Sequence, residues 1–461
     1  MRAVLLSTYE LGRQPFGLAS PAAWLRRAGH AVACFDLSRR VADPAVLAAA
    51  DLIGFYLPMH TATRLALEAL PQIRQLNPQA HLCGFGLYAP LNASQLQAAG
   101  MHTVLSGEFE ASLTALADRL TAGQRPDEAG ASAARGLPAQ HSGNLERLRF
   151  LVPDRSDLPP LTEYAGLVQP DGTTRVVGYT EASRGCKHHC RHCPIVPVYE
   201  GRFRVVQRDV VLADIRQQVA AGAEHITFGD PDFFNGIGHA AAIVRELHTE
   251  FPRLSYDVTI KIEHLLRHAD HLSLLRSTGC VLVTSAVESF DDAVLALLDK
   301  GHTRADFETA VTLLRQHGLN LSPTFVTFTP WTTAESYCEL LERLADLELI
   351  EQVAPIQLAV RLLVPAQSRL LELQAMRRHL DGFDAAALTW IWRHPDPRMD
   401  AFCATLQEII GAGVKTEQSR ATIFNTVWDA AHALIEGATR LPPVPPPGRA
   451  TVPYLNEPWF C

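Results

Sequence analysis

The sequence predicts an α/β protein. Its parts are an N-terminal Rossmann- or flavodoxin-like domain with a parallel sheet, a partial (βα)6 TIM-like barrel and a helical C-terminal extension. Two observations predict this. Short apolar runs of strand length alternate with helical stretches, as in parallel sheets covered by helices. A segment rich in Ala, Gly, Arg and Pro, without periodicity, divides this alternation into two series. The expected divisions are a first domain at 1–121, a linker at 122–150, a barrel at 151–367, a helical region at 368–440 and a Pro-rich spacer with tail at 441–461.

The first series predicts a complete small domain. Its apolar runs predict strands and its longer amphipathic stretches predict helices on both faces of one parallel sheet. We expect strands at 2–7, 30–37, 51–57, 80–86 and 102–107, and helices at 21–29, 63–76, 93–100 and 109–120.

The second series predicts six strands with intervening helices, which suggests an open barrel rather than a closed eight-stranded one. We expect strands at 176–183, 225–230, 255–262, 280–289, 321–328 and 355–365, with a helix near 210–221 after the first. Chemistry in such barrels collects at the carboxyl ends of the strands. A helical region near 368–436 follows, and the proline-rich LPPVPPPG then predicts an extended spacer.

Composition excludes several classes of protein. The 461 residues are 47% hydrophobic and 20% charged, as in an ordinary globular protein, and the net charge is −8. This charge removes the general electrostatic reason to expect nucleic acid as a partner. No apolar run is long enough for a membrane span, and the first residues do not resemble a signal peptide. The nine cysteines are odd in number and scattered outside one run, so we expect a reducing, cytoplasmic environment.

That run, SRGCKHHCRHCPIV, carries Cys186, Cys190 and Cys193. Their spacing would suit one helix face, but Gly185 and Pro194 flank the run and favour a loop. A loop can wrap three sulfurs around one centre. Three thiolates leave one iron of a [4Fe–4S] cluster without a protein ligand, as a catalytic cluster requires.

A structural zinc site is the alternative interpretation. His188, His189 or His192 would supply a fourth ligand in tetrahedral geometry. Zinc sites of this kind usually pair two short Cys/His spacings, and no second set follows here.

The run resembles the signature of the radical S-adenosylmethionine (SAM) superfamily, C-x3-C-x2-C with an aromatic residue before the last cysteine. Cys186, Cys190 and Cys193 match the cysteines, and His192 holds the aromatic position. The resemblance implies a [4Fe–4S] cluster whose open iron chelates SAM, reductive cleavage of SAM and release of a 5′-deoxyadenosyl radical.

The resemblance also implies residues that bind SAM. Gly229 and Asp230 end the second barrel strand, where the superfamily often has an acidic turn for the methionine ammonium; Asp232 is less favoured. An ordinary Asp-Pro turn is the alternative. Lys261 and Arg361 are candidates for the SAM carboxylate, and structural ion pairs are the alternative for both.

The fourth barrel strand leads into Glu288-Ser289 and then Lys-Gly-His-Thr, a pattern that resembles many radical SAM proteins. Glu288 and Ser289 would bind the ribose hydroxyls. The alternative is that they cap the next helix.

The first domain resembles the cobalamin-binding-like domain that precedes many radical SAM barrels. The matching features include Pro15 with Gly17, Asp36 at a strand end, and Ser106-Gly107-Glu108. The motif D-x-H-x-x-G, which supplies a histidine to cobalt in some relatives, is absent. Cobalamin is therefore a possible cofactor, and a ligand-free scaffold is the alternative.

The tail TVPYLNEPWFC resembles that of the CUAEP/CCAEP-tail radical SAM (seleno)protein family. The resemblance implies that Cys461 acts as a tail nucleophile or redox group, and that a selenocysteine codon follows it. An idle cysteine at a true end is the alternative.

These features predict a radical SAM enzyme acting on an unknown small molecule or peptide, reduced by a donor such as ferredoxin or flavodoxin. A cobalamin-dependent radical SAM methyltransferase is the first alternative. From another class comes a non-enzymatic zinc- or iron–sulfur-binding scaffold. Methylthiolation of tRNA is disfavoured, because neither a basic module nor a second cysteine set is present.

Overall fold

The computed structural model describes residues 1–124, 145–435, 442–443 and 453–456. The expected linker falls largely outside these ranges, as do most of the proline-rich spacer and Cys461. No helix in the described ranges combines the length and the apolar character that a membrane span needs.

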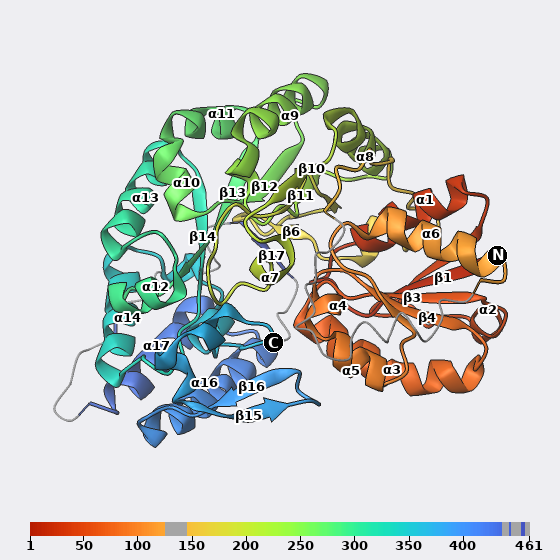
Figure 1. Ribbon diagram of the computed structural model, residues 1–461. Helices are drawn as coiled ribbons and strands as arrows, with labels where there is room; N and C mark the ends of the chain where they lie inside the picture. The colour runs from red at the N-terminus through yellow and green to blue at the C-terminus, as the bar shows by residue number, and fades with distance from the viewer. Residues whose placement is uncertain (125–144, 436–441, 444–452, 457–461) are drawn as a thin grey trace.

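The N-terminal domain is a five-stranded parallel sheet with the order β2-β1-β3-β4-β5 (Figure 1). Its strands are β1 (Arg2–Ser7), β2 (Ala31–Asp36), β3 (Leu52–Tyr56), β4 (His81–Phe85) and β5 (Thr103–Val104). Its helices are α1 (Phe16–Arg27), α2 (Pro44–Ala48), α3 (His60–Leu76), α4 (Tyr88–Leu91), α5 (Ala93–Ala98) and α6 (Phe109–Thr121).

Both faces of this sheet are buried, which explains why its strands are apolar almost throughout. Leu5 points into a core with α1 and α6, whereas Val4 and Leu6 point into a second core with α3. The strand order reverses between β1 and β3, and this creates a topological switch point at the carboxyl edge of the sheet.

The second sheet is also parallel and has the order β14-β13-β12-β11-β8. The strands are β8 (Val177–Thr180), β11 (His225–Phe228), β12 (Ser255–Thr259), β13 (Cys280–Glu288) and β14 (Asn320–Phe325). The helices around it (Figure 1) are α8 (Arg208–Ala220), α9 (Ile237–Glu250), α10 (Ile262–Arg267), α11 (Leu272–Ser277), α12 (Asp292–Leu298), α13 (Arg304–Gln316) and α14 (Ala334–Asp346). A partial TIM-like barrel is thus confirmed.

The expected sixth strand at 355–365 is wrong in detail. Residues Pro355–Leu358 form a 3₁₀ turn, and the strand is reduced to a single parallel bridge between Phe328 and Arg361. The bridge consists of two hydrogen bonds, from the Phe328 N–H to the Val360 carbonyl and from the Leu362 N–H to the Phe328 carbonyl, and the 3₁₀ turn before it takes the first residues out of the ladder.

The C-terminal region is helical except at its beginning. A hairpin of β15 (Leu380–Asp384) and β16 (Thr389–Trp392) follows α15 (Gln374–Arg377) and precedes α16 (Pro397–Lys415) and α17 (Arg420–His432). The expectation of helix from 368 onward is therefore wrong for this hairpin. Strand β16 (TWIW) consists of aromatic and β-branched residues, and Asp384 accepts hydrogen bonds from the Ala386 and Ala387 N–H groups to shape the turn.

The last described segment docks at the domain junction. Strand β17 (Tyr454–Leu455) pairs antiparallel with β6 (Leu167–Val168), which in turn pairs with β7 (Thr174–Arg175). The guanidinium of Arg420 lies 4.6 Å from the ring centroid of Tyr454. An apolar segment close to the end of the sequence is thus packed against the barrel.

Candidate cluster and cofactor site

The three cysteines lie on one loop between β9 (Ser183–Gly185) and the short helix α7 (Val196–Tyr199). Strand β10 (Phe203–Val205) pairs with β9 and closes the loop at its base. The turn before Cys186 depends on Gly185, which has φ +75°, and a Cβ there would overlap the ring of Tyr199. Inside the loop, the Cys193 N–H donates to the carbonyl of Cys190 at 3.2 Å.

The thiols are close enough to influence one another. Burial raises the pKa of Cys193 to about 12, and the neighbouring Cys190 and Cys186 act in the same direction. Burial also raises the pKa of Cys186. A metal centre bound here would therefore displace protons from these thiols. The remaining described cysteines lie in apolar cores and leave these three for the loop: Cys34, Cys83, Cys280, Cys338 and Cys403.

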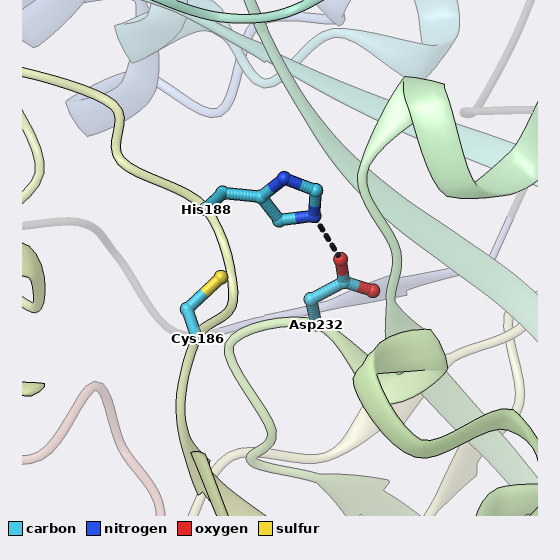
Figure 2. Close-up of side chains that lie close together, drawn as sticks. All are labelled: Cys186, His188 and Asp232. Atoms are coloured by element: carbon cyan, nitrogen blue, oxygen red, sulfur yellow. Dashed lines mark ion pairs between the residues drawn. The ribbon is translucent and has the colours of Figure 1, made fainter. Parts of the chain in front are cut away.

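Beside Cys186 the structure gathers an imidazole and a carboxylate. The ligand atoms of Cys186, His188 and Asp232 lie within 4.8 Å of one another, and Figure 2 shows the three side chains converging. The Oδ2 of Asp232 lies 3.3 Å from His188 Nε2 and 2.7 Å from His264 Nδ1. Burial opposes ionisation of Asp232, but the two imidazoles hold its pKa below the ordinary value.

Lys261 joins this group from the residue before α10. Its Nζ lies 3.1 Å from His188 Nδ1 and 3.4 Å from Glu263 Oε2, and the residue is 9% exposed. The predicted cation on the third strand is thus beside the cysteine loop.

Glu288 joins the loop from the end of β13. Its Oε1 lies 3.1 Å from His192 Nε2 and 3.2 Å from the ammonium of Lys300. Burial opposes ionisation, yet Lys300 and His192 lower the pKa of Glu288 to about 2. The adjacent Ser289 accepts a hydrogen bond from the Asp291 N–H at 3.0 Å, so its hydroxyl shapes the turn before α12.

The two aspartates of the turn after β11 make different contacts. Asp230 accepts hydrogen bonds from the Ala182 N–H at 2.9 Å and from the Ser183 hydroxyl at 2.6 Å. It thereby braces the strand leading into the cysteine loop, while Asp232, the less favoured acid, lies beside Cys186. Gly229 packs so closely on Tyr179 that a Cβ would overlap its ring.

Arg361 lies with the C-terminal region instead. Its guanidinium pairs with Asp400 at 2.7 Å, donates to the Trp392 carbonyl at 2.7 Å and stacks 3.6 Å from the Trp392 ring centroid. These contacts are those of a structural ion pair.

Two residues of the group, His264 and Lys300, were not singled out from the sequence. The signal for His264 is the spacing of His264, His268 and His271, which repeats at i, i+4 and i+7. Their rings follow one another at centroid separations of 5.6 and 6.1 Å. Lys300 belongs to the Lys-Gly-His-Thr pattern, which indicates the superfamily but does not by itself give Lys300 a role.

The residues present fit a cluster with a polar, charged ligand. Three thiols lie on one loop, close enough for Cys190 and Cys186 to influence Cys193. Around them, the buried Nδ1 of His192 has no hydrogen-bond partner among the described residues. Buried polar atoms without partners are costly, so a ligand that pairs with them is favoured. SAM carries an ammonium, a carboxylate and hydroxyls that suit such groups together with Lys261 and Glu288.

Comparisons with known proteins agree with this geometry. Residues 180–344 match the sequence model of the Radical SAM superfamily. In Chlorobaculum tepidum, a tRNA-2-methylthio-N(6)-dimethylallyladenosine synthase is 24% identical over 192 residues, covering 38% of this chain and 41% of the relative. A bacteriochlorophyllide d C-12(1)-methyltransferase of the same organism is 26% identical over 148 residues, covering 32% of each protein. The chain thus spans less than half the length of these curated relatives.

Solved structures share the fold over most of the chain. The radical SAM methyltransferase TsrM from Kitasatospora setae, with tryptophan substrate and a SAM analogue, superposes with a TM-score of 0.64 at 20% identity, covering 88% of both chains. The cobalamin-dependent radical SAM enzyme OxsB, with aqua-cobalamin and SAM bound, has a TM-score of 0.70 at 14% identity, covering 90% of this chain and 67% of OxsB. At these identities the likeness concerns the fold.

The predicted fold class is confirmed, and so is the superfamily assignment of the barrel. A radical SAM domain implies a [4Fe–4S] cluster and SAM as cofactors, and cobalamin is compatible with the solved neighbours. Residues 180–344, with the cysteine loop at their amino end, are a radical SAM domain within a chain whose fold is that of the cobalamin-dependent radical SAM enzymes TsrM and OxsB.

Proposed function

We propose that this chain is a radical SAM enzyme in which Cys186, Cys190 and Cys193 hold a [4Fe–4S] cluster. The observation that carries the proposal is the placement of three largely buried cysteines on one loop, where Cys190 and Cys186 both raise the pKa of Cys193, with the other described cysteines in apolar cores. When bound, the reduced cluster supplies the electron that cleaves SAM to a 5′-deoxyadenosyl radical. The substrate is a small molecule or peptide, the electron donor a ferredoxin or flavodoxin, and the location cytoplasmic.

The chain's own residues hold and orient the ligand. Lys261, with a buried ammonium, suits the SAM carboxylate, while Asp232 offers an anion for the methionine ammonium. Glu288 is held ionised by Lys300 and is ready to accept hydrogen bonds from ribose hydroxyls. Asp230 acts behind these groups by fixing Ala182 and Ser183 at the start of the loop.

Anaerobic purification and reconstitution test the proposal. We expect a brown protein with about four irons and four sulfides per chain, which forms 5′-deoxyadenosine from SAM under dithionite. The triple variant Cys186→Ala/Cys190→Ala/Cys193→Ala should lose both the iron and the product. The surface variant Glu408→Gln on α16 should retain both. A colourless wild-type protein that makes no 5′-deoxyadenosine after reconstitution would refute the proposal.

A zinc-binding scaffold is the second candidate. The set of Cys186, His188 and Asp232 supports it, because sulfur, imidazole and carboxylate are ordinary zinc ligands. Metal analysis separates the two candidates. One zinc per chain, lost on His188→Ala, would favour the scaffold, whereas four irons that remain in that variant favour the cluster.

We further propose that the tail belongs to the CUAEP/CCAEP type, on the sequence Glu457-Pro458-Trp459-Phe460-Cys461. Cys461 would then act as a nucleophile or redox group next to a selenocysteine. Sequencing the gene beyond the Cys461 codon tests this. A UGA codon followed by Ala-Glu-Pro codons supports the proposal, and any other continuation removes it.

A further inference from the structure

A cavity of about 200 Å³ lies where the N-terminal domain meets the barrel; we refer to it as the junction cavity. On one side it is formed by residues that follow β1 and β3 at the topological switch point of the N-terminal sheet. On the other side it is formed by β8, the start of the cysteine loop and the turn after β11. Its polar lining includes Glu10, Arg13, Tyr179 and Glu181, and its barrel side includes Gly185 and Gly229.

One carboxyl oxygen and one guanidinium nitrogen in the lining lack hydrogen-bond partners among the described residues. Glu10 is 5% exposed, and its Oε2 has no hydrogen-bond partner within the described ranges. The buried Nε of Arg13 also has none there, and its guanidinium lies 5.1 Å from the Tyr179 ring centroid. The described ion pairs include none between Glu10 and Arg13. Unpaired buried groups of this kind are costly unless a ligand meets them.

We propose that the junction cavity binds a small zwitterion such as a free amino acid, with its ammonium at Glu10 and its carboxylate at Arg13. This deepens the proposed function, on which it rests, because the zwitterion would be the substrate. A carboxylate is the natural partner of an ammonium, and a guanidinium that of a carboxylate.

The rest of the lining suits the side chain of such a molecule. Beyond Glu10 and Arg13 the cavity wall is mixed: Glu181, Ser183 and Arg184 are polar, and Met59, Leu87, Ile195 and Val198 form its apolar part. Gly185, which directly precedes Cys186, and Gly229 form its barrel side. A ligand held by its polar end at the β1 loop therefore directs its side chain toward the cluster loop.

The size of the cavity favours a small ligand over cobalamin. The junction cavity has a volume of about 200 Å³. Pockets for drug-sized molecules span about 300–1,000 Å³, and a corrin with its nucleotide tail is larger still. The switch point beneath the cavity is also filled, because the Tyr56 ring packs directly on Gly17 and touches Phe85 and Phe109.

Binding to the reconstituted, full-length protein tests the inference without an activity readout. Each free L-amino acid is titrated anaerobically into cluster-loaded protein with SAM, using calorimetry. The best ligand is then compared with its N-acetyl and carboxamide forms, and hydroxocobalamin is tested by gel filtration. We expect at least one free amino acid to bind, and each blocked form to bind about tenfold more weakly or worse.

Variants assign the two ends of the ligand. Glu10→Gln should weaken binding of the free amino acid by about tenfold or more. The same change should have little effect on binding of the N-acetyl form, which lacks the ammonium. Arg13→Gln should also weaken binding of the free amino acid, but it should have little effect on binding of the carboxamide, which lacks the carboxylate. Glu408→Gln on the surface of α16 should bind as the wild type does. Circular dichroism melting and iron content confirm that each variant is folded and loaded.

The inference is overturned if no free amino acid binds, if Glu10→Gln and Arg13→Gln bind as tightly as the wild type, or if cobalamin is retained stoichiometrically. Formation of 5′-deoxyadenosine by the wild type separates the two proposals. If SAM is cleaved but no zwitterion binds, only this inference fails. If a zwitterion binds through Glu10 but SAM is never cleaved, the proposed function fails.

Discussion

At the scale of single residues, the site depends on buried charges that hold one another in place. Glu288 has φ +72° at the end of β13, an unusual conformation for a residue that is not glycine, and its carboxylate lies between His192 and Lys300. The strand pairing shifts register at this point. Backbone strain of this kind persists only where the surroundings impose it, and it often marks a functional position.

The Glu288–Lys300 pair should behave as a unit. Either Glu288→Gln or Lys300→Met leaves the other charge buried and unpaired, because the side chains are only 8% and 4% exposed. We expect each single change to lower the apparent free energy of unfolding by about 3–5 kcal/mol. The double variant should recover at least about half of the summed loss. Urea unfolding of all four proteins measures this, and strictly additive losses would show that the pair is not coupled.

Asp230 predicts a pH dependence of stability. Burial raises its pKa to about 7, although hydrogen bonds from Ser183 and Ala182 act against this. In the unfolded chain an aspartate titrates near ~3.9, so between pH 5 and 7 only the folded state holds this proton. Stability should therefore fall as pH rises toward 7, by up to about 1.4 kcal/mol per pH unit, and then level off.

Thermal unfolding between pH 5.5 and 8 checks this expectation against two variants. Asp230→Asn should remove this contribution to the slope. Asp209→Asn, at an exposed position in the first turn of α8, should keep it. An unchanged slope in Asp230→Asn would contradict the assignment.

At the scale of elements, the cysteine loop depends on the turn that begins it. Gly185 and Gly222 both have positive φ, at +75° and +98°, but their surroundings differ. A Cβ at Gly185 would overlap Tyr199, whereas a Cβ at Gly222 would meet open space. The pair therefore separates backbone strain from a steric clash.

We expect Gly222→Ala to cost roughly 1 kcal/mol of stability and to leave the iron content unchanged. Gly185→Ala should cost several times more and displace the loop, because Tyr199 is buried against Glu108 at 3.1 Å and has little room to move. Iron analysis and melting temperature measure both effects. Equal iron contents in the two variants would show that the loop does not need the Gly185 turn.

Prediction from sequence succeeded best at this scale. The helices and strands of the first domain follow from their apolar runs, since alternating residues of strands such as β1 face two separate cores. It failed where local signals compete. Residues 355–365 are apolar enough for a strand, but their first four residues form a 3₁₀ turn and only one bridge is left. The hairpin at 380–392 lies among helix formers and is recognisable only from its aromatic residues.

At the scale of the whole molecule, the two sheets meet through a buried charge cluster. Arg184, at the base of the cysteine loop, donates to Glu108 and Glu110 of the N-terminal domain and to Glu181. The guanidinium is 8% exposed and both N-terminal carboxylates are fully buried. Burial raises the pKa of Glu108 to about 7, although the positive charge of Arg184 acts in the opposite direction. The position of the cysteine loop is thus tied to the first domain.

Arg184→Met should therefore destabilise the whole protein. It leaves buried carboxylates without their cation, which costs about 3–5 kcal/mol. Arg216→Met, which removes an exposed ion pair with Glu250, should cost less than about 1 kcal/mol. Calorimetric unfolding compares them, and we expect Arg184→Met to shift the main transition. Equal effects would mean that the junction cluster does not join the domains.

The sequence by itself determined the fold class, the cysteine loop and the superfamily, because these depend on local periodicity and on spacings within a few residues. The tertiary structure decided which charged side chains lie beside the cysteine loop. It placed Asp232 rather than Asp230 beside Cys186, assigned Arg361 to the C-terminal region, and joined Glu10 and Arg13 to the barrel across the junction cavity. These outcomes depend on side-chain direction at strand ends and on the packing of two domains, which are properties of the folded chain that no short stretch of sequence encodes.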